Sequence, residues 1–230
     1  MPHDHHDHSH EGLSPSGHPY RADNDGPLTY WQTMEIAMRE LLIEKGITTA
    51  AQITARIEEM DRRSPADGAM VIARAWTDPE FKALLLRDGS AACKSMGFEP
   101  GVLRLIAVEN TPDVHNVIVC TLCSCYPRNL LGLPPDWYKT RAYRSRVVKE
   151  PRKVLAEFGL ILPDAVQVRV HDSTADMRYI VLPARPAGTE DLDQTALADL
   201  ITRDSMIGVG VPSQPTAQPT AQKTVTKAAR

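Results

Sequence analysis

The sequence predicts an α+β protein in which a helical arm precedes a layered α-β-β-α core. Apolar residues of the first half recur at three- and four-residue spacing, which is typical of amphipathic helices. From about residue 102 short apolar runs and strict alternation indicate strands instead. These strands and the later helices follow no regular alternation, which favours α+β over a doubly wound parallel sheet.

Length and charge limit the classes of protein. The 230 residues suffice for one domain with extensions, and 26 Lys and Arg against 29 Asp and Glu argue against a general nucleic-acid-binding surface. No apolar run approaches the ~20 residues that span a bilayer. Histidines and acids stand where a secretory signal has its apolar segment. We therefore expect a cytoplasmic protein with neither nucleic acid nor a membrane as a partner.

Composition divides the chain into four parts. Residues 1–26 combine histidine, acidic residues, glycine and proline, and predict a disordered leader. Its histidines either hold divalent metal loosely or form a solvated tail or a tag. Residues 27–95 form the helical arm, residues 96–211 the α+β domain, and residues 212–230 a flexible tail.

The arm contains four expected helices and lacks an intervening strand. They cover residues 30–45 with a stop at Gly46, residues 53–60, residues 66–76, and a segment that starts at Asp78-Pro79 and continues to Leu85. Short amphipathic helices of this kind make an arm rather than a compact core. We expect their apolar stripes to be buried against a partner subunit.

The second half contains both strands and helices. Strands are expected at residues 102–108, 117–119, 166–170 and 179–182, and helices at residues 135–149, 151–158 and 192–203.

The cysteines carry most of the functional information. Three of the four, Cys120, Cys123 and Cys125, lie within six residues, and Cys93 lies 27 residues upstream of Cys120. A secreted disulfide scaffold would spread its cysteines along the chain. Structural zinc and four-cysteine iron–sulfur sites need a fourth ligand that is doubtful here. A thiol–disulfide enzyme would leave Cys125 unexplained.

The spacing Cys-x-x-Cys-x-Cys permits a tetragonal metal site. Sulfurs of Cys123 and Cys125 can bind one ion together with the deprotonated peptide nitrogens of Ser124 and Cys125, a plane that d-block ions prefer. Cys120 can supply an axial thiolate, which leaves one position open for metal-assisted hydration. A buried or redox-regulated thiol cluster is the structural alternative.

Longer motifs carry a family resemblance over roughly residues 28–212. V-C-T-L-C-S-C-Y-P, L-G-L-P-P-D-W-Y-K and I-T-R-D-S-M-I-G-V-G-V-P resemble the metal-binding α chain of nitrile hydratase. The resemblance implies non-corrinoid cobalt(III) or iron(III), with Cys120 as the unmodified thiolate, Cys123 as a sulfinic acid and Cys125 as a sulfenic acid. It also implies that Ser124 and Cys125 supply backbone amides to the metal.

Two neighbours of the cysteines bear on the metal and the substrate. Thr121 and Tyr126 resemble the cobalt class, so we expect cobalt(III) rather than iron(III). Arg128 stands where cobalt enzymes of this family usually carry tryptophan. In this feature the chain resembles the cobalt-binding γ subunit of thiocyanate hydrolase.

The expected activity is therefore hydration of a nitrile to its amide at low-spin cobalt(III), with thiocyanate hydrolysis as the alternative and metal storage or delivery as a third. The nucleophile is either metal-activated hydroxide or the Cys125 sulfenate oxygen. Tyr126 either lines the substrate pocket or is an aromatic core residue. The resemblance implies a β subunit in an (αβ)2 heterotetramer and an activator protein that inserts cobalt.

Three other features have simpler explanations. His115 is expected to be a hydrogen-bonded structural histidine, and Cys93 a half-buried helical cysteine. The basic run from Lys139 to Lys153 predicts a helix at a subunit interface or in solvent.

Overall fold

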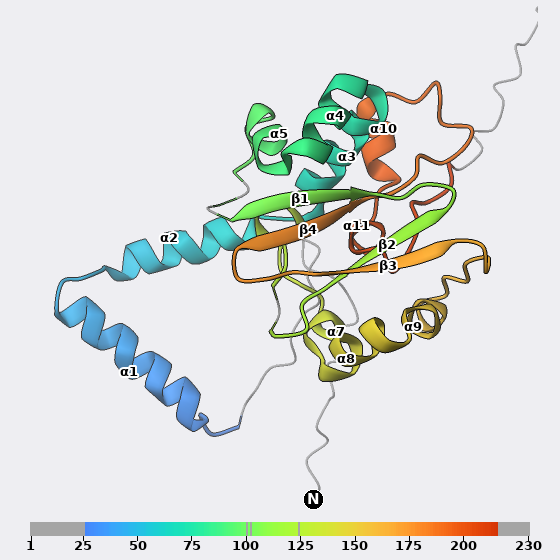
Figure 1. The fold of residues 1–230 in the computed structure, drawn as a ribbon. Helices are drawn as coiled ribbons and strands as arrows, with labels where there is room; N and C mark the ends of the chain where they lie inside the picture. The colour runs from blue at the N-terminus through green and yellow to red at the C-terminus, as the bar shows by residue number, and fades with distance from the viewer. Residues whose placement is uncertain (1–25, 100, 102, 124, 216–230) are drawn as a thin grey trace, which may run out of the picture.

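The computed structural model describes residues 26–99, 101, 103–123 and 125–215. Helices and strands mix along the chain, as an α+β protein requires (Figure 1). The leader expected at residues 1–26 lies outside the described residues except for Gly26. The expected tail lies outside them from the residue after Pro215 onward. The sequence predicted four helices in the arm. The structure adds a short fifth helix after the fourth. The elements run α1 (Tyr30–Glu44), α2 (Ala50–Asp61), α3 (Pro65–Thr77), α4 (Pro79–Arg87), α5 (Gly89–Ser95), β1 (Arg104–Glu109), β2 (Val114–Val119), α6 (Arg128–Leu131), α7 (Asp136–Lys139), α8 (Arg141–Lys149), α9 (Pro151–Glu157), β3 (Gln167–Asp172), β4 (Met177–Leu182), α10 (Gln194–Asp199) and α11 (Arg203–Ile207).

The first two helices are defined by local signals and project away from the strands (Figure 1). Thr29 with Gln32, and Thr49 with Gln52, form reciprocal capping boxes that satisfy the first backbone N–H groups of α1 and α2. Neither helix contains a buried residue. Their apolar stripes therefore stay exposed in the single chain, and Trp31 keeps 77% of its surface.

The next three helices pack differently from the arm that the sequence predicts. α3 buries Val71, Ile72 and Ala75 and lies against α10, while α4 and α5 lie against β1. Their apolar faces join the same core cluster as the strands. Residues 65–95 consequently belong to the packing of the core, because its strands and α10 supply an apolar surface that local spacing does not reveal.

The strands pair in parallel across long stretches of sequence. β1 pairs with β4, and β2 pairs with β3, in two two-stranded sheets. In the second pair Val119 is the register partner of Asp172. The chain beyond Val119 therefore begins its loop beside the carboxyl end of β3.

The helices α7, α8 and α9 lie on the other side of the strands from α3, α4 and α5 (Figure 1). One continuous helix over residues 135–149 was the wrong expectation, because Thr140 is extended and its side chain caps α8 by accepting from the Tyr143 backbone nitrogen. The helix expected over residues 192–203 is shorter than expected, because α10 ends at Asp199 and extended Thr202 caps the separate helix α11.

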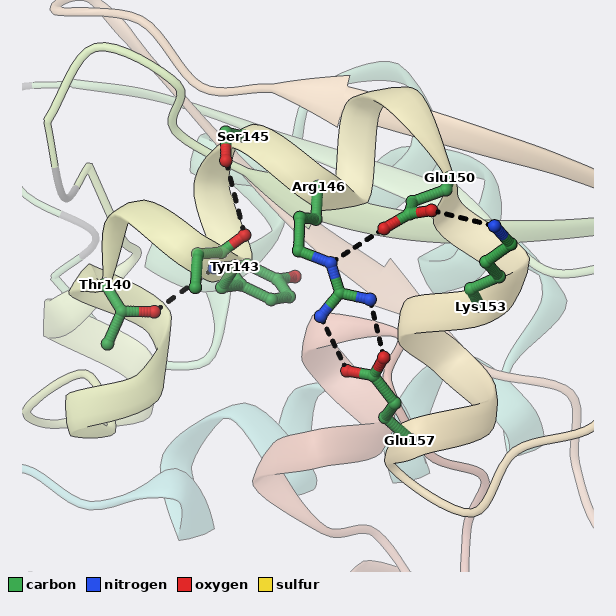
Figure 2. A network of polar contacts seen from close by, with 8 residues as sticks. Thr140, Tyr143, Ser145, Arg146, Glu150, Lys153 and Glu157 are labelled. Carbon is green, nitrogen blue, oxygen red and sulfur yellow. Dashed lines mark hydrogen bonds and ion pairs between the residues drawn. The ribbon is translucent and has the colours of Figure 1, made fainter.

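An ion-pair network joins α8 to α9 (Figure 2). Arg146 donates through Nε to Glu150 at 2.7 Å and through its two terminal nitrogens to Glu157 at 2.9 and 2.5 Å. Lys153 also approaches Glu150, at 3.1 Å. Part of the basic run is thus neutralised inside the chain. Among the described residues no helix is long and apolar enough to cross a membrane.

Candidate metal centre

Three sulfurs converge in the loop that follows β2. The Sγ atoms of Cys120, Cys123 and Cys125 all lie within 4.8 Å of one another. Cys123 Sγ lies 3.4 Å from Cys120 Sγ and 3.2 Å from Cys125 Sγ, and the Cys123 backbone nitrogen donates to Cys120 Sγ at 3.3 Å. Cys120 is buried and Cys123 is exposed, so the cluster opens to solvent on one side.

Burial and the neighbouring sulfurs oppose ionisation of the Cys125 thiol when no cation is present. The pKa of Cys125 is raised to about 12, first by burial and then by its hydrogen bonds with Cys123 and Cys120, while the positive charge of Arg178 acts in the opposite direction. A bound cation reverses this balance, because thiolates coordinate metals and the neighbouring negative charges are then compensated.

The backbone of the loop is fixed at Thr121. Asp172, the last residue of β3, accepts from the Thr121 nitrogen at 2.9 Å and from its hydroxyl at 2.5 Å. Arg144 on α8 donates to the Thr121 carbonyl at 3.3 Å. Groups from two separate elements therefore hold the residue next to Cys120.

Two tyrosines hold the cysteine loop and the end of β2 from the helical side. Tyr138 on α7 donates to the Cys125 carbonyl at 2.9 Å, and Tyr143 on α8 donates to the Ile118 carbonyl at 2.7 Å. Both rings are buried, and Trp137 packs edge-on against each of them. Burial raises the pKa of both tyrosines, so both stay protonated donors.

A pocket of about 340 Å3 adjoins the cysteine loop. Its wall includes Tyr126 and Pro127, which follow Cys125 in the chain, together with Arg56, Arg128 and Arg178. The Tyr126 hydroxyl is buried and has no hydrogen-bond partner among the described residues. A buried hydroxyl without a partner is uncommon, and the charges that act on this one belong to Arg203 and Asp204, which do not line the pocket. The ring of Tyr126 also packs on Tyr138, so the residue serves both the core and the pocket.

The structure thus brings three predicted residues together and leaves others elsewhere. Cys120, Cys123 and Cys125 form the cluster, whereas Ser124 lies outside the described residues. Cys93 is fully buried in α5, where the sequence predicted only half burial. His115 is a structural histidine as expected, since its Nε2 lies 2.7 Å from the Gly208 carbonyl oxygen.

Sequence reasoning missed the residues that support the cluster. Asp172, Tyr138, Tyr143 and Arg178 have no distinctive spacing relative to the cysteines. One signal was present for Asp172: it ends an alternating strand, and polar residues at the ends of neighbouring parallel strands meet at one edge. The tyrosines depend on how α7 and α8 pack, which local sequence does not specify.

The donor atoms fit a transition-metal ion. Three sulfurs on a short loop suit soft or borderline ions and do not suit calcium or magnesium, which prefer oxygen. Asp172 and the tyrosines restrain the backbone between and beside these donors, as outer-shell partners of metal ligands do.

Comparisons with known proteins identify the family. The family model described as nitrile hydratase, alpha chain, matches residues 29–210. The low-molecular-weight cobalt-containing nitrile hydratase subunit alpha of Rhodococcus rhodochrous is 50% identical over 184 residues, which cover 78% of this chain and 88% of that protein. The thiocyanate hydrolase subunit gamma of Thiobacillus thioparus is 42% identical over 212 residues, covering 87% of each.

A solved structure agrees in fold. A double mutant of the Fe-type nitrile hydratase from Comamonas testosteroni Ni1 superposes with a TM-score of 0.78 at 41% identity, over 86% of this chain and 100% of that one. The family match spans the helices, the strands and the cysteine loop together. This chain therefore belongs to the nitrile hydratase α-chain family.

Proposed function

We propose that this chain is the metal-binding catalytic subunit of a cobalt-type nitrile hydratase, a hydro-lyase that adds water to a nitrile and forms the amide. The observation that carries the proposal is the convergence of three sulfurs within 4.8 Å in a loop held from two sides. Membership of the family and the similarity to cobalt-containing relatives support it.

Cobalt(III) is the proposed ion, held by Cys120, Cys123 and Cys125 with the backbone nitrogens of Ser124 and Cys125. Thr121 and the cobalt-containing relative favour it over iron(III). We assign Cys120 as the unmodified thiolate, Cys123 as the sulfinic acid and Cys125 as the sulfenic acid. The bound ion supplies Lewis acidity that makes a nitrile carbon more electrophilic.

The remaining side chains prepare the reaction. Tyr138 fixes the Cys125 carbonyl, and Asp172 fixes Thr121, so the donor atoms keep one arrangement through the reaction. Tyr126 lies in the pocket wall and is proposed to contact the substrate there. Arg178 places positive charge close to Cys125, which favours an anionic oxidised sulfur there.

A β subunit is the proposed partner of α1 and α2. Eight large apolar side chains on or beside these helices are exposed: Leu28, Tyr30, Trp31, Met34, Met38, Leu41, Ile47 and Ile57. Covering apolar surface stabilises association by about 25 cal/mol per Å2 before ordering costs are subtracted. We propose an (αβ)2 heterotetramer in the cytoplasm, loaded with cobalt by an activator protein.

We propose a leader at residues 1–26, a partner-contacting arm formed by α1 and α2 within residues 27–95, a layered α-β-β-α catalytic domain at residues 96–211 against which α3, α4 and α5 pack, and a tail at residues 212–230. Deletion of residues 1–48 tests the arm, because it removes α1 and leaves the cysteine loop and α2. Loss of co-purification with the β subunit is expected. A stoichiometric, active complex would contradict this role.

The function itself is tested by co-expression with the partner subunit and the activator. We expect one cobalt per chain, amide formation from a nitrile, and peptide masses that show two added oxygens on Cys123, one on Cys125 and none on Cys120. The Cys120→Ala variant should lose cobalt and activity, whereas Cys93→Ala should keep both, since Cys93 lies in α5. Full activity with zinc alone, or three unmodified thiols in an active sample, would refute the assignment.

Thiocyanate hydrolysis is the second candidate, favoured by Arg128 in the pocket wall and by similarity to the thiocyanate hydrolase subunit gamma. Thiocyanate is an anion, and an arginine beside the cluster attracts it. The same preparation, assayed with thiocyanate and with a nitrile, separates the two candidates. Faster consumption of thiocyanate at equal concentration would favour the hydrolase.

A further inference from the structure

The pocket beside the cysteine loop is cationic. Arginines from three separate elements line it: Arg56 on α2, Arg128 on α6 and Arg178 on β4. No aspartate or glutamate is among its lining residues in the described part of the chain. Most of the remaining wall is apolar, with Leu103, Leu105 and Leu130. A concave, largely apolar pocket with a few convergent charged groups is the usual form of a small-molecule site.

Two of these charges are not neutralised by carboxylates. Within the described residues neither Arg128 nor Arg178 forms an ion pair. Arg178 donates to main-chain carbonyls instead, with the Met177 oxygen at 3.0 Å and the Ala175 oxygen at 3.4 Å. Carbonyl oxygens orient a guanidinium group and leave its net charge in place. Arg56 differs, because Glu59 pairs with it.

The arm helix α2 is fastened to this pocket at its far end. Arg63, two residues after α2, donates to the Asn129 side chain on α6. Asn129 itself lines the pocket next to Arg128. The position of Arg56 at the pocket wall is therefore tied to the helix that carries Arg128.

The volume of the pocket favours one kind of anion over another. The pocket measures about 340 Å3, and one water in the liquid has a share of roughly 30 Å3. A linear ion of three heavy atoms fills only a small part of such a space. A nitrile with a carboxylate fits better, since its apolar chain can contact the leucines while its charge meets an arginine.

We propose that this pocket selects nitriles that carry a carboxylate, with Arg128 and Arg178 as the residues that determine this specificity. This inference rests on the proposed nitrile hydration and adds the substrate class. The carboxylate lies among the arginines, and the nitrile end lies on the side of Tyr126, the residue that follows Cys125 in the chain.

The test uses cobalt-loaded holoenzyme and two probes of nearly identical shape, cyanoacetate and cyanoacetamide, which differ in charge. We expect KM for cyanoacetate to be lower by about tenfold or more at low ionic strength. The preference should shrink as salt is added, because salt screens interactions between charges. Equal KM values for the two probes would overturn the inference and leave nitrile hydration intact.

Variants assign the effect to residues. Arg128→Gln and Arg178→Gln should each lower the cyanoacetate-to-cyanoacetamide ratio of kcat/KM by about tenfold, and Arg128→Lys should restore most of it. Arg62→Gln is the matched control, since Arg62 is exposed at the end of α2 and does not line the pocket. A ratio that is unchanged in both glutamine variants, or lowered equally by Arg62→Gln, would contradict the assignment.

Two further outcomes keep the substrate class separate from the activity. If neither probe yields an amide, nitrile hydration fails, and calorimetry then decides the inference: tighter binding of cyanoacetate than of cyanoacetamide supports it, and equal or absent binding overturns it. If thiocyanate is consumed in preference to cyanoacetate, the pocket serves a smaller anion and the carboxylate class is wrong.

Discussion

Asp172 accepts two hydrogen bonds from one residue, Thr121, through its separate carboxylate oxygens at 2.9 and 2.5 Å. The parallel register makes this possible, since Val119, two residues before Thr121, lies opposite Asp172. The carboxylate therefore closes the end of the β2–β3 pair and fixes the first turn of the cysteine loop. A hydrogen bond to a charged group contributes about 1.5–3 kcal/mol, which is enough to select one loop conformation.

Replacing this carboxylate should loosen the metal centre without unfolding the chain. We expect Asp172→Asn to lower cobalt occupancy or activity by about 10- to 100-fold, the usual cost of losing an outer-shell partner. Elemental analysis and amide formation measure the effect. Asp164→Asn is the matched control, because Asp164 is an exposed carboxylate in the turn before β3. Equal losses in both variants would show that the effect is not specific to the loop.

Cys123 and Cys93 should react with an alkylating reagent at different rates, because their surroundings differ. In the metal-free protein Cys123 is exposed, whereas Cys93 is fully buried and burial raises its pKa to about 12. Alkylating reagents react with thiolates and not with thiols. Cys93 should therefore be labelled at least about tenfold more slowly than Cys123. Peptide mapping after timed treatment with iodoacetamide reports the order. Early labelling of Cys93 would mean that α5 opens readily.

Two histidines, His115 buried and His171 half-buried, should make stability fall in mild acid. Burial lowers the pKa of His115 and of His171, and Arg169 lowers that of His171 further. The fold keeps both rings neutral, while the unfolded chain takes up protons below its ordinary value of 6.5. Stability contributed by the neutral rings is therefore complete above that value and is lost as pH falls through it.

The measurement is the free energy of unfolding in urea between about pH 7 and about pH 5. His115 receives a hydrogen bond from the Asn110 amide on Nδ1 when its Nε2 donates to Gly208, so a proton on Nδ1 disrupts that contact. His115→Gln, which carries no titrating ring, should flatten part of the decline. A decline of the same size in that variant would place the effect elsewhere.

Gly208 should tolerate no side chain. Its φ is +91°, and a Cβ there would lie 2.0 Å from the Asn116 carbonyl oxygen and 2.8 Å from the Val117 Cα. Gly97 has a similar φ of +80° with nothing within 4 Å of its Cβ position. Both alanine variants incur about 1–2 kcal/mol of backbone strain. Gly208→Ala should lose about 2 kcal/mol more, because it also displaces β2. Equal unfolding free energies would show that β2 moves without cost.

Local signals in the sequence predicted where helices form, but they did not predict which helices are buried in the core. The spacing of Trp31, Met34 and Met38 and the cap at Thr29 specify α1 without help from the rest of the chain. Burial of α3 depends instead on α10, which lies more than a hundred residues later, so the arm was predicted too long. Thr140 and Thr202 are helix caps that apolar spacing alone overlooks.

The site shows the same division. Cysteine spacing predicts the three sulfurs, because their separation is a property of a short segment. Asp172, Tyr138 and Arg178 reach the loop through strand register and helix packing, which join distant parts of the chain. The spacing of residues within a short segment could not predict those contacts.

The Thr121–Asp172 contact spans 51 residues of sequence, and this separation orders events during synthesis. The cysteines emerge from the ribosome well before β3, so for that interval they belong to an unpaired strand end. Closing so long a loop has an entropic cost that only the complete β2–β3 pair offsets. Stable capture of the ion must consequently wait until translation has passed residue 172, and the nascent thiols are open to oxidation or to adventitious metals until then.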